Sequence, residues 1–106
     1  MKIKIINTTT NSNKTANYIA ELLVLQKLSP CVQIIKEIVT IYHWDKRLNK
    51  SNEILITVKT VPEKVEDCKS LIIKHHNYDI PELIIYDGTI ILDDYRDWFI
   101  MNCSDK

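Results

Sequence analysis

The hydrophobic and polar positions of this chain repeat with two different periods, beginning with an alternating segment. Lys2–Ile6 alternates lysine and isoleucine, and a period of two predicts a first strand with one buried face. Thr8–Asn13 is polar and turn-like, and Asn11, Ser12 or Asn13 is suited to cap a helix. From Thr15 to Leu28 the apolar residues follow helical spacing, with a wide buried stripe.

The next apolar segment is unusually long for a strand. Ser29-Pro30 ends the first helix, and Cys31–Trp44 is rich in Val, Ile, Thr and aromatic residues. Its 14 residues exceed the usual strand of about 5–6. Because Lys36-Glu37 interrupts its apolar character, we expect the strand to bend at a bulge near Lys36 or to extend beyond its own sheet.

A returning strand and a second helix are predicted next. Asp45–Lys50 reads as a polar turn, and Glu53–Thr60 alternates isoleucine and valine with polar residues. Thr60 is suited to cap a helix, with Pro62 in its first turn and Glu63 completing a capping box. We expect this helix to bury a stripe and to end near His75-His76-Asn77, where Asn77 tolerates the left-handed conformation. The stripe consists of Val65, Cys68, Leu71 and Ile72.

The remaining pattern completes a recognisable order of elements. Leu83–Tyr86 predicts a short buried strand, Asp87-Gly88 a turn, and Asp93 or Asp94 the cap of a last helix. The order β-α-β-β-α-β is that of the ferredoxin-like fold, an α+β architecture. We therefore predict one domain, residues 1–106, with helices on one face of a four-stranded antiparallel sheet and an added C-terminal helix.

Composition narrows the classes of function. Basic and acidic residues balance at 14 each, whereas a nucleic-acid binder would show a basic excess, so we expect no nucleic-acid partner. The single glycine, Gly88, excludes Gly-rich phosphate loops. No apolar run approaches the length of a membrane span or of a signal sequence, so we expect no membrane association. Three widely spaced cysteines without CxxC spacing favour reduced thiols in a cytoplasmic protein.

Five segments in order resemble the CutA divalent-cation tolerance family over nearly the whole chain. They are Leu28–Ile35, Ile41–Trp44, Glu53–Thr60, His75–Glu82 and the Tyr95-x-x-Trp98 motif. The resemblance implies a homotrimer in which long hairpins reach across to neighbouring subunits. Independently, a long unpaired hairpin leaves edge groups that pairing with another chain would satisfy. We expect a set of residues at the trimer interface or cleft: Tyr42, Trp44, Lys59, Tyr78 and Trp98.

The resemblance also implies a metal site, which this sequence matches in part. The candidates carried over are His75 and Glu82, with His76 as their neighbour, for weak binding of copper or zinc. A cysteine that some members use aligns with Thr8, whose hydroxyl is a poor ligand for soft copper ions. The alternatives are that the histidines interact with a helix C-terminus, that Glu82 forms an ion pair between subunits, and that Lys59 is solvated. The family's turn glycine is replaced by Asp45-Lys46-Arg47, so we expect a reshaped turn.

No catalytic constellation appears in the sequence. No Ser, Cys or Thr nucleophile has an identifiable base and orienting group, and we predict that the protein is not an enzyme. Two functions remain open. One is a trimeric protein that responds to divalent cations. The other, an alternative by analogy with the trimeric PII-type regulators, is a small-molecule or protein-partner sensing module without metal dependence, with its ligand at the subunit cleft.

Overall fold

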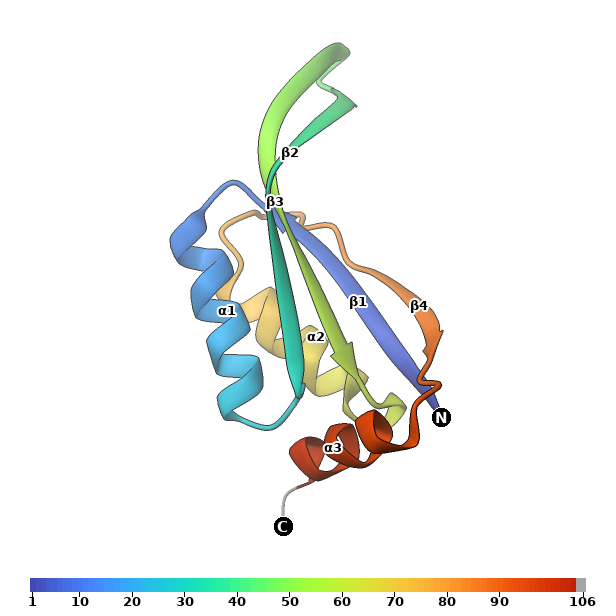
Figure 1. The fold of residues 1–106 in the computed structure, drawn as a ribbon. Helices are drawn as coiled ribbons and strands as arrows, with labels where there is room; N and C mark the ends of the chain where they lie inside the picture. Colours follow the sequence, from blue (N-terminus) through green and yellow to red (C-terminus); the bar gives the residue numbers. More distant parts are fainter. Residues whose placement is uncertain (105–106) are drawn as a thin grey trace.

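The computed structural model, which describes residues 1–104, confirms the ferredoxin-like α+β fold. One four-stranded antiparallel sheet has the strand order β2-β3-β1-β4, and α1 and α2 lie together on one of its faces (Figure 1). The elements in chain order are β1 Lys2–Thr10, α1 Asn13–Leu25, β2 Cys31–Trp44, β3 Arg47–Thr60, the short 3-10 helix η1 Pro62–Lys64, α2 Val65–His75, β4 Ile84–Thr89 and α3 Asp93–Cys103.

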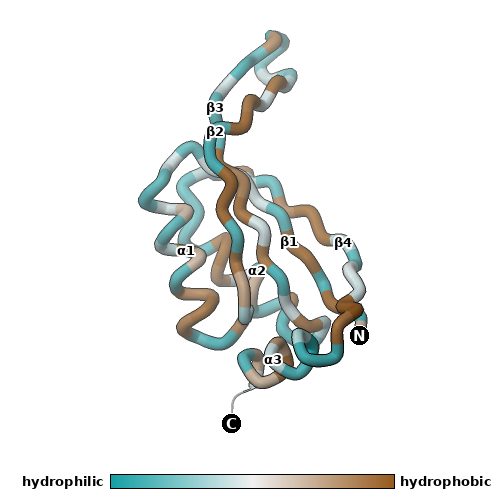
Figure 2. Tube along the Cα trace, viewed as in Figure 1, coloured by the Kyte–Doolittle hydropathy of each residue, from teal (hydrophilic) through white to brown (hydrophobic). Residues whose placement is uncertain are grey.

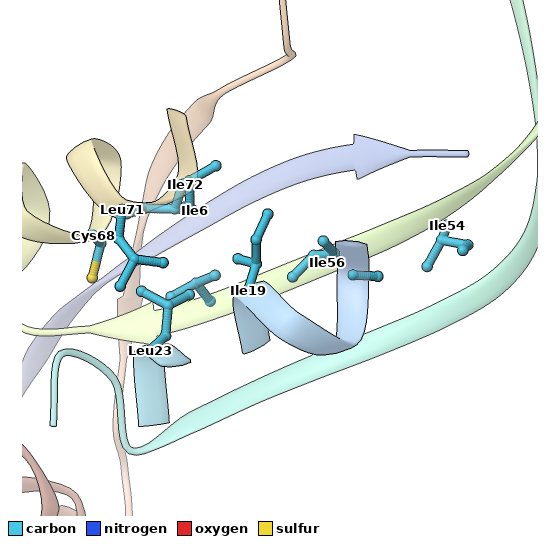
Figure 3. Packing of buried hydrophobic residues seen from close by; sticks show 10 residues of the cluster. Ile6, Ile19, Leu23, Ile54, Ile56, Cys68, Leu71 and Ile72 are labelled. Carbon is cyan, nitrogen blue, oxygen red and sulfur yellow. The ribbon is translucent and has the colours of Figure 1, made fainter. Parts of the chain in front are cut away.

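The main core lies between the sheet and the two helices. Alternate residues of β1 and β3, among them Ile6, Ile56 and Val58, face Ile19 and Leu23 of α1 (Figure 3). The other helix, α2, contributes Cys68, Leu71 and Ile72, which confirms the predicted stripe except that Val65 is only partly buried. The apolar residues that alternate along the strands and those that follow helical spacing thus form one core, as expected for helices packed on a sheet.

Local hydrogen bonds decide the ends of α1. The Ser12 hydroxyl accepts a hydrogen bond from the Thr15 N–H, which confirms a cap in the predicted region. The helix ends at Leu25, three residues before the predicted Leu28. Lys27 adopts φ 58°, and the Leu28 N–H returns to the Leu23 carbonyl, as in a Schellman motif. This motif, and not Ser29-Pro30, stops the helix.

Several other predicted boundaries were wrong. The polar residues Thr8–Thr10 continue β1 instead of forming a turn, because they pair with Ile54–Ile56 of β3 and the side chains of Thr8 and Thr10 are fully buried. Thr60 does not cap the second helix; its hydroxyl donates to the Leu28 carbonyl at 2.6 Å. The predicted end of α2 is confirmed, since the helix ends at His75, but His76 is extended and Asn77 does not adopt the left-handed conformation.

The C-terminal third differs from the prediction at two further points. Asp87 and Gly88 lie within β4, paired with Lys4 and Ile3 of β1, instead of forming a turn. Neither Asp93 nor Asp94 caps α3, since both lie in its first turn, where their carboxylates favour the positive end of the helix dipole.

A second small cluster holds α3 at the end of the sheet where β1 begins. Phe99 and Cys103 of α3 are buried against Ile3, with Val61 and Ile90 at the edge of the cluster. All three cysteines are free thiols, in agreement with the prediction from their spacing.

The hairpin β2–β3 both bends and extends past the sheet, so the two alternatives predicted for it hold together. Lys36 and Glu37 form a bulge between the Ile35–Leu55 and Ile38–Glu53 pairs, and Glu37 adopts φ 63°. The last pair between β1 and β3 is Thr10–Ile54. Beyond it, the two hairpin strands pair only with each other and project away from the helices (Figure 1).

The turn at the hairpin tip is tighter than predicted. Trp44 pairs with Arg47, so the loop consists only of Asp45 and Lys46, and Arg47–Lys50 belong to β3. Asp45 and Lys46 adopt φ 52° and φ 60°, as in a type I′ turn. Lys46 thus occupies a conformation in which glycine is favoured, and a reshaping of this turn relative to the family stays a prediction.

Candidate functional site

A hollow of about 500 Å³ opens where the hairpin leaves the sheet. Thr40, Tyr42 and Trp44 form one wall, since residues two apart on a strand point to the same face. Thr9 at the end of β1 and Glu53 of β3 form its base. Glu53 alternates with the core residues of β3, so the hollow lies on the sheet face opposite α1 and α2.

The loop between α2 and β4 forms the other wall of this hollow. It contributes Tyr78, Asp79, Ile80 and Glu82, of which only Tyr78 is partly buried. The hollow is thus lined by three carboxylates, and no lysine, arginine or histidine of the described chain lines it. Although the whole chain is neutral, this surface is acidic and will attract cations.

A buried carboxylate anchors the loop to the sheet. Glu53 is only 7% exposed, and its Oε2 accepts a hydrogen bond of 2.7 Å from the Tyr78 hydroxyl. Burial raises the pKa of Tyr78, and the bond to Glu53 raises it further, so Tyr78 remains a hydrogen-bond donor at neutral pH. This pair fixes one aromatic ring beside one carboxylate at the base of the hollow.

His76 positions the start of the same loop. Its Nε2 lies 2.9 Å from the Thr9 carbonyl, and its Nδ1 accepts from the Tyr78 N–H at 2.9 Å. One nitrogen must donate and the other accept, which assigns the neutral Nε2–H tautomer. Burial lowers the pKa of His76, although its bond to Thr9 and the nearby Glu53 oppose this shift. Neither ring nitrogen is therefore free to bind a metal ion.

The other predicted metal ligands are not gathered into a metal site within one chain. His75 packs edge-on against Tyr18 of α1, with ring centroids 5.2 Å apart, whereas Glu82 lies in the wall of the hollow. Across residues 1–104, no three side chains among histidine, cysteine, aspartate and glutamate are grouped so as to hold one metal ion. The donor set of a single chain does not fit a tight copper or zinc site, which needs three or four ligands.

Thr8, at the position of the family's cysteine, lies on the opposite side of β1 from the hollow. It is fully buried on the face that α1 and α2 cover, and its hydroxyl has no hydrogen-bond partner within residues 1–104. Its neighbour Thr9, one residue on, faces the hollow instead.

The structure divides the predicted cleft residues between two places. Tyr42, Trp44 and Tyr78 share the acidic hollow. Lys59 lines a separate, mostly apolar hollow of about 500 Å³ beside β1, β4 and Tyr95, towards the other end of the sheet. Trp98 of α3 packs on Tyr95, with ring centroids 5.4 Å apart.

Sequence reasoning missed Glu53 and Asp79 as site residues. The sequence predicts Glu53 only as the first residue of a strand that follows a turn ending at Lys50. At that boundary the pattern did not show which face of the sheet the first side chains occupy. The signal that was present is its alternation with Ile54, Ile56 and Val58, which places it on the face away from the core.

Comparison with known proteins gives a consistent family match. A sequence model of the family described as CutA1 divalent ion tolerance protein matches residues 4–102. A divalent-cation tolerance protein CutA from Thermus thermophilus is 28% identical over 93% of this chain and 96% of its own length. The chloroplastic protein CutA of Arabidopsis thaliana is 28% identical over 89% of this chain, which spans about half (52%) of the plant protein. The chain likewise spans 63% of a zebrafish (Danio rerio) CutA homolog, at 29% identity.

Solved structures agree with the sequence match. The CutA1 protein of Ehrlichia chaffeensis superposes with a TM-score of 0.90 at 28% identity, covering 96% of this chain and 95% of that one. CutA1 from Shewanella sp. SIB1 gives 0.89 at 31% identity, with 94% of each chain covered. None of the helices within residues 1–104 combines the length and apolar character needed to cross a membrane.

Proposed function

Because the chain belongs to the family of CutA1 divalent ion tolerance proteins, we propose that it acts as a homotrimeric cation-tolerance protein and not as an enzyme. The observation that carries this proposal is the acidic hollow at the base of a hairpin that projects from the sheet. Cations are attracted to such a surface by its carboxylates.

Assembly is supported by the surface of the hairpin itself. Five large apolar side chains are well exposed on it: Val39, Ile41, Tyr42, Trp44 and Leu48. Figure 2 shows hydrophobic positions continuing along the hairpin past the end of the sheet. Val39 and Ile41 alternate with Tyr42 and Trp44 along β2, so both faces of the hairpin carry exposed apolar side chains. Exposed apolar surface on a strand pair with open edges is typical of an association surface. Lys59 and Trp98, near the other end of the sheet, would lie at further contacts between subunits.

Metal binding in this proposal is weak and shared between subunits. Glu82 in the hollow and His75 at the end of α2 would each offer one ligand to copper or zinc, while His76 keeps the loop in place. Ligands from a neighbouring subunit or water would complete the coordination, since residues 1–104 of one chain hold no complete set.

Calorimetric titration with Cu(II) and Zn(II) tests this proposal, with molecular mass measured by light scattering in the same buffer. We expect the mass of three chains and saturable metal binding that His75→Ala and Glu82→Ala both weaken. A molecular mass of one chain, or metal binding that both variants retain, would contradict the proposal.

A second candidate function is favoured by the size of the hollow. A volume of about 500 Å³ is far larger than one metal ion needs and lies in the range of small-molecule sites. A sensing module of this kind would bind an organic ligand without metal. For either function we propose a cytoplasmic location, where the three thiols would stay reduced; the name of the plant relative, by contrast, places that protein in the chloroplast.

A further inference from the structure

We propose that the hollow at the base of the hairpin binds a small organic cation, an alkyl ammonium or diamine, held by Glu53 and by aromatic rings. This inference names a ligand class for the small-molecule candidate above and rests on it, but it requires no metal. The residues that line the hollow are Thr9, Thr40, Tyr42, Trp44, Glu53, Tyr78, Asp79, Ile80 and Glu82.

Glu53 is a largely buried carboxylate that has no positively charged partner in the part of the chain that the structure describes. A buried carboxylate is costly unless a hydrogen bond or a positive group compensates it. The Tyr78 hydroxyl bonds its Oε2, and no basic side chain within residues 1–104 forms an ion pair with Glu53. Its Oε1 is not among the buried atoms that lack a hydrogen-bond partner, so it is accessible from the hollow. Because Glu53 lines the hollow, a cation inside the hollow would supply the missing partner.

The hollow also has an aromatic lining. Tyr42, Trp44 and Tyr78 all line the same hollow. The faces of aromatic rings attract ammonium groups, with tryptophan the strongest of the three types. The faces of these rings do not coordinate copper or zinc, which bind nitrogen, sulfur or oxygen atoms, and the Tyr78 hydroxyl already donates to Glu53. The lining therefore favours an organic cation over a bare metal ion.

The lining also bears on the shape of the ligand. Glu53 belongs to β3, whereas Asp79 and Glu82 belong to the loop between α2 and β4, so carboxylates from two separate segments line the hollow. Ile80 and the aromatic rings provide apolar surface for the alkyl part of a ligand. A diamine, with two charges joined by a short alkyl chain, matches this combination.

The test is calorimetric titration of the full chain with 1,4-diaminobutane and with tetramethylammonium, at constant ionic strength. The neutral 1-butanol serves as the ligand control. We expect saturable binding of both cations and none of the alcohol. Removing the charge with Glu53→Gln, which keeps an acceptor for Tyr78, should weaken binding about tenfold or more, a loss of about 1.4 kcal/mol. Asp94→Asn, an exposed carboxylate on α3, should bind as the parent does.

If Glu53→Gln does not fold, the exposed loop variant Asp79→Asn with Glu82→Gln takes its place, and the same loss is expected. Absence of cation binding, equal binding of the alcohol, or equal affinity in the charge-removing variants would overturn the inference. If a basic side chain of another copy fills the hollow, the amines will not bind, which also overturns it.

Titration with Zn(II) in the same buffer separates this inference from the metal proposal. We expect Glu53→Gln to keep any zinc binding that His75→Ala loses. Zinc binding without amine binding would overturn the inference and support the metal proposal. Amine binding without zinc binding would support the inference and contradict the metal proposal.

Discussion

Strands β2 and β3 run through both the body of the molecule, which is the sheet with its helices, and the hairpin that projects from it. The surroundings of their apolar side chains differ between the two regions. In the body, Ile54, Ile56 and Val58 of β3 are buried beneath α1 and α2. Beyond the bulge at Lys36-Glu37, the strands have no helix above them and their apolar side chains lie exposed. The molecule is correspondingly long, 47 Å by 25 Å by 21 Å.

The difference indicates that the body is stabilised mainly within one chain and the hairpin mainly by contact with another chain. The body has a core of its own between the sheet and the helices α1 and α2, so much of its folding free energy arises within one chain. The hairpin has strong local pairing and a tight turn but no core of its own, and an isolated two-stranded ribbon is only marginally stable. The hairpin therefore gains most from contact with another chain.

The largest expected effect lies in the body. Ile56→Ala removes a fully buried side chain and should lower the free energy of unfolding by about 2–5 kcal/mol, since the cavity cannot fill. Its hairpin counterpart, Ile41→Ala, should act only through assembly. Denaturant titration at two protein concentrations separates them: the Ile56→Ala loss persists at both, whereas the Ile41→Ala loss changes with concentration. Equal and concentration-independent losses would remove the distinction.

A smaller effect is expected where the two regions meet. Tyr78→Phe keeps the ring but removes the donor to the buried Glu53, and should cost about 1–3 kcal/mol in denaturant unfolding. Tyr86→Phe, on the exposed side chain of β4, is the matched control and should change stability little. A Tyr78→Phe protein as stable as the control would show that the Glu53 bond contributes nothing.

The stability of the folded chain should depend on pH through His76 in the body and not through the hairpin. The pKa of His76 is lowered in the folded chain, while the unfolded chain takes up a proton near the ordinary value of about 6.5. The unfolded state therefore binds more protons as pH falls below this value, and stability should decrease on acidification. Thermal unfolding between pH 7.5 and about 5.5 measures this. His76→Gln should reduce the slope, and His43→Gln, on the exposed hairpin, should leave it unchanged; equal slopes in the two variants would contradict the account.

The smallest effect concerns the turn. Lys46 adopts φ 60°, where glycine is favoured, so Lys46→Gly should stabilise the hairpin by about 0.5–1 kcal/mol. Lys50→Gly, within β3, should destabilise instead. Hydrogen exchange of the hairpin amides reports both changes. A destabilised Lys46→Gly hairpin would mean that the lysine side chain holds the turn.

Much of the fold was predictable because its signals are local. The alternation in Lys2–Ile6 and the helical stripe of α2 each fixed an element and its buried face. The ends of elements were less predictable, because they depend on distant partners: Thr60 bonds Leu28, and Thr8–Thr10 are buried by other segments. The resemblance brought out Tyr42, Trp44, Tyr78 and Glu82, which the structure does bring together. Glu53 was missed because its partner Tyr78 lies 25 residues away.

The central claim is that the exposed apolar surface of the hairpin exists for assembly, and a matched pair of leucines tests it. Leu48 on the hairpin is 80% exposed and Leu25 at the end of α1 is 77% exposed, so Leu→Ser is the same chemical change in both regions. Molecular mass by light scattering should show three chains for the parent and for Leu25→Ser. Leu48→Ser should shift the population towards single chains as the protein is diluted. A parent protein of single mass, or a Leu48→Ser protein that assembles as tightly as Leu25→Ser, would contradict the claim.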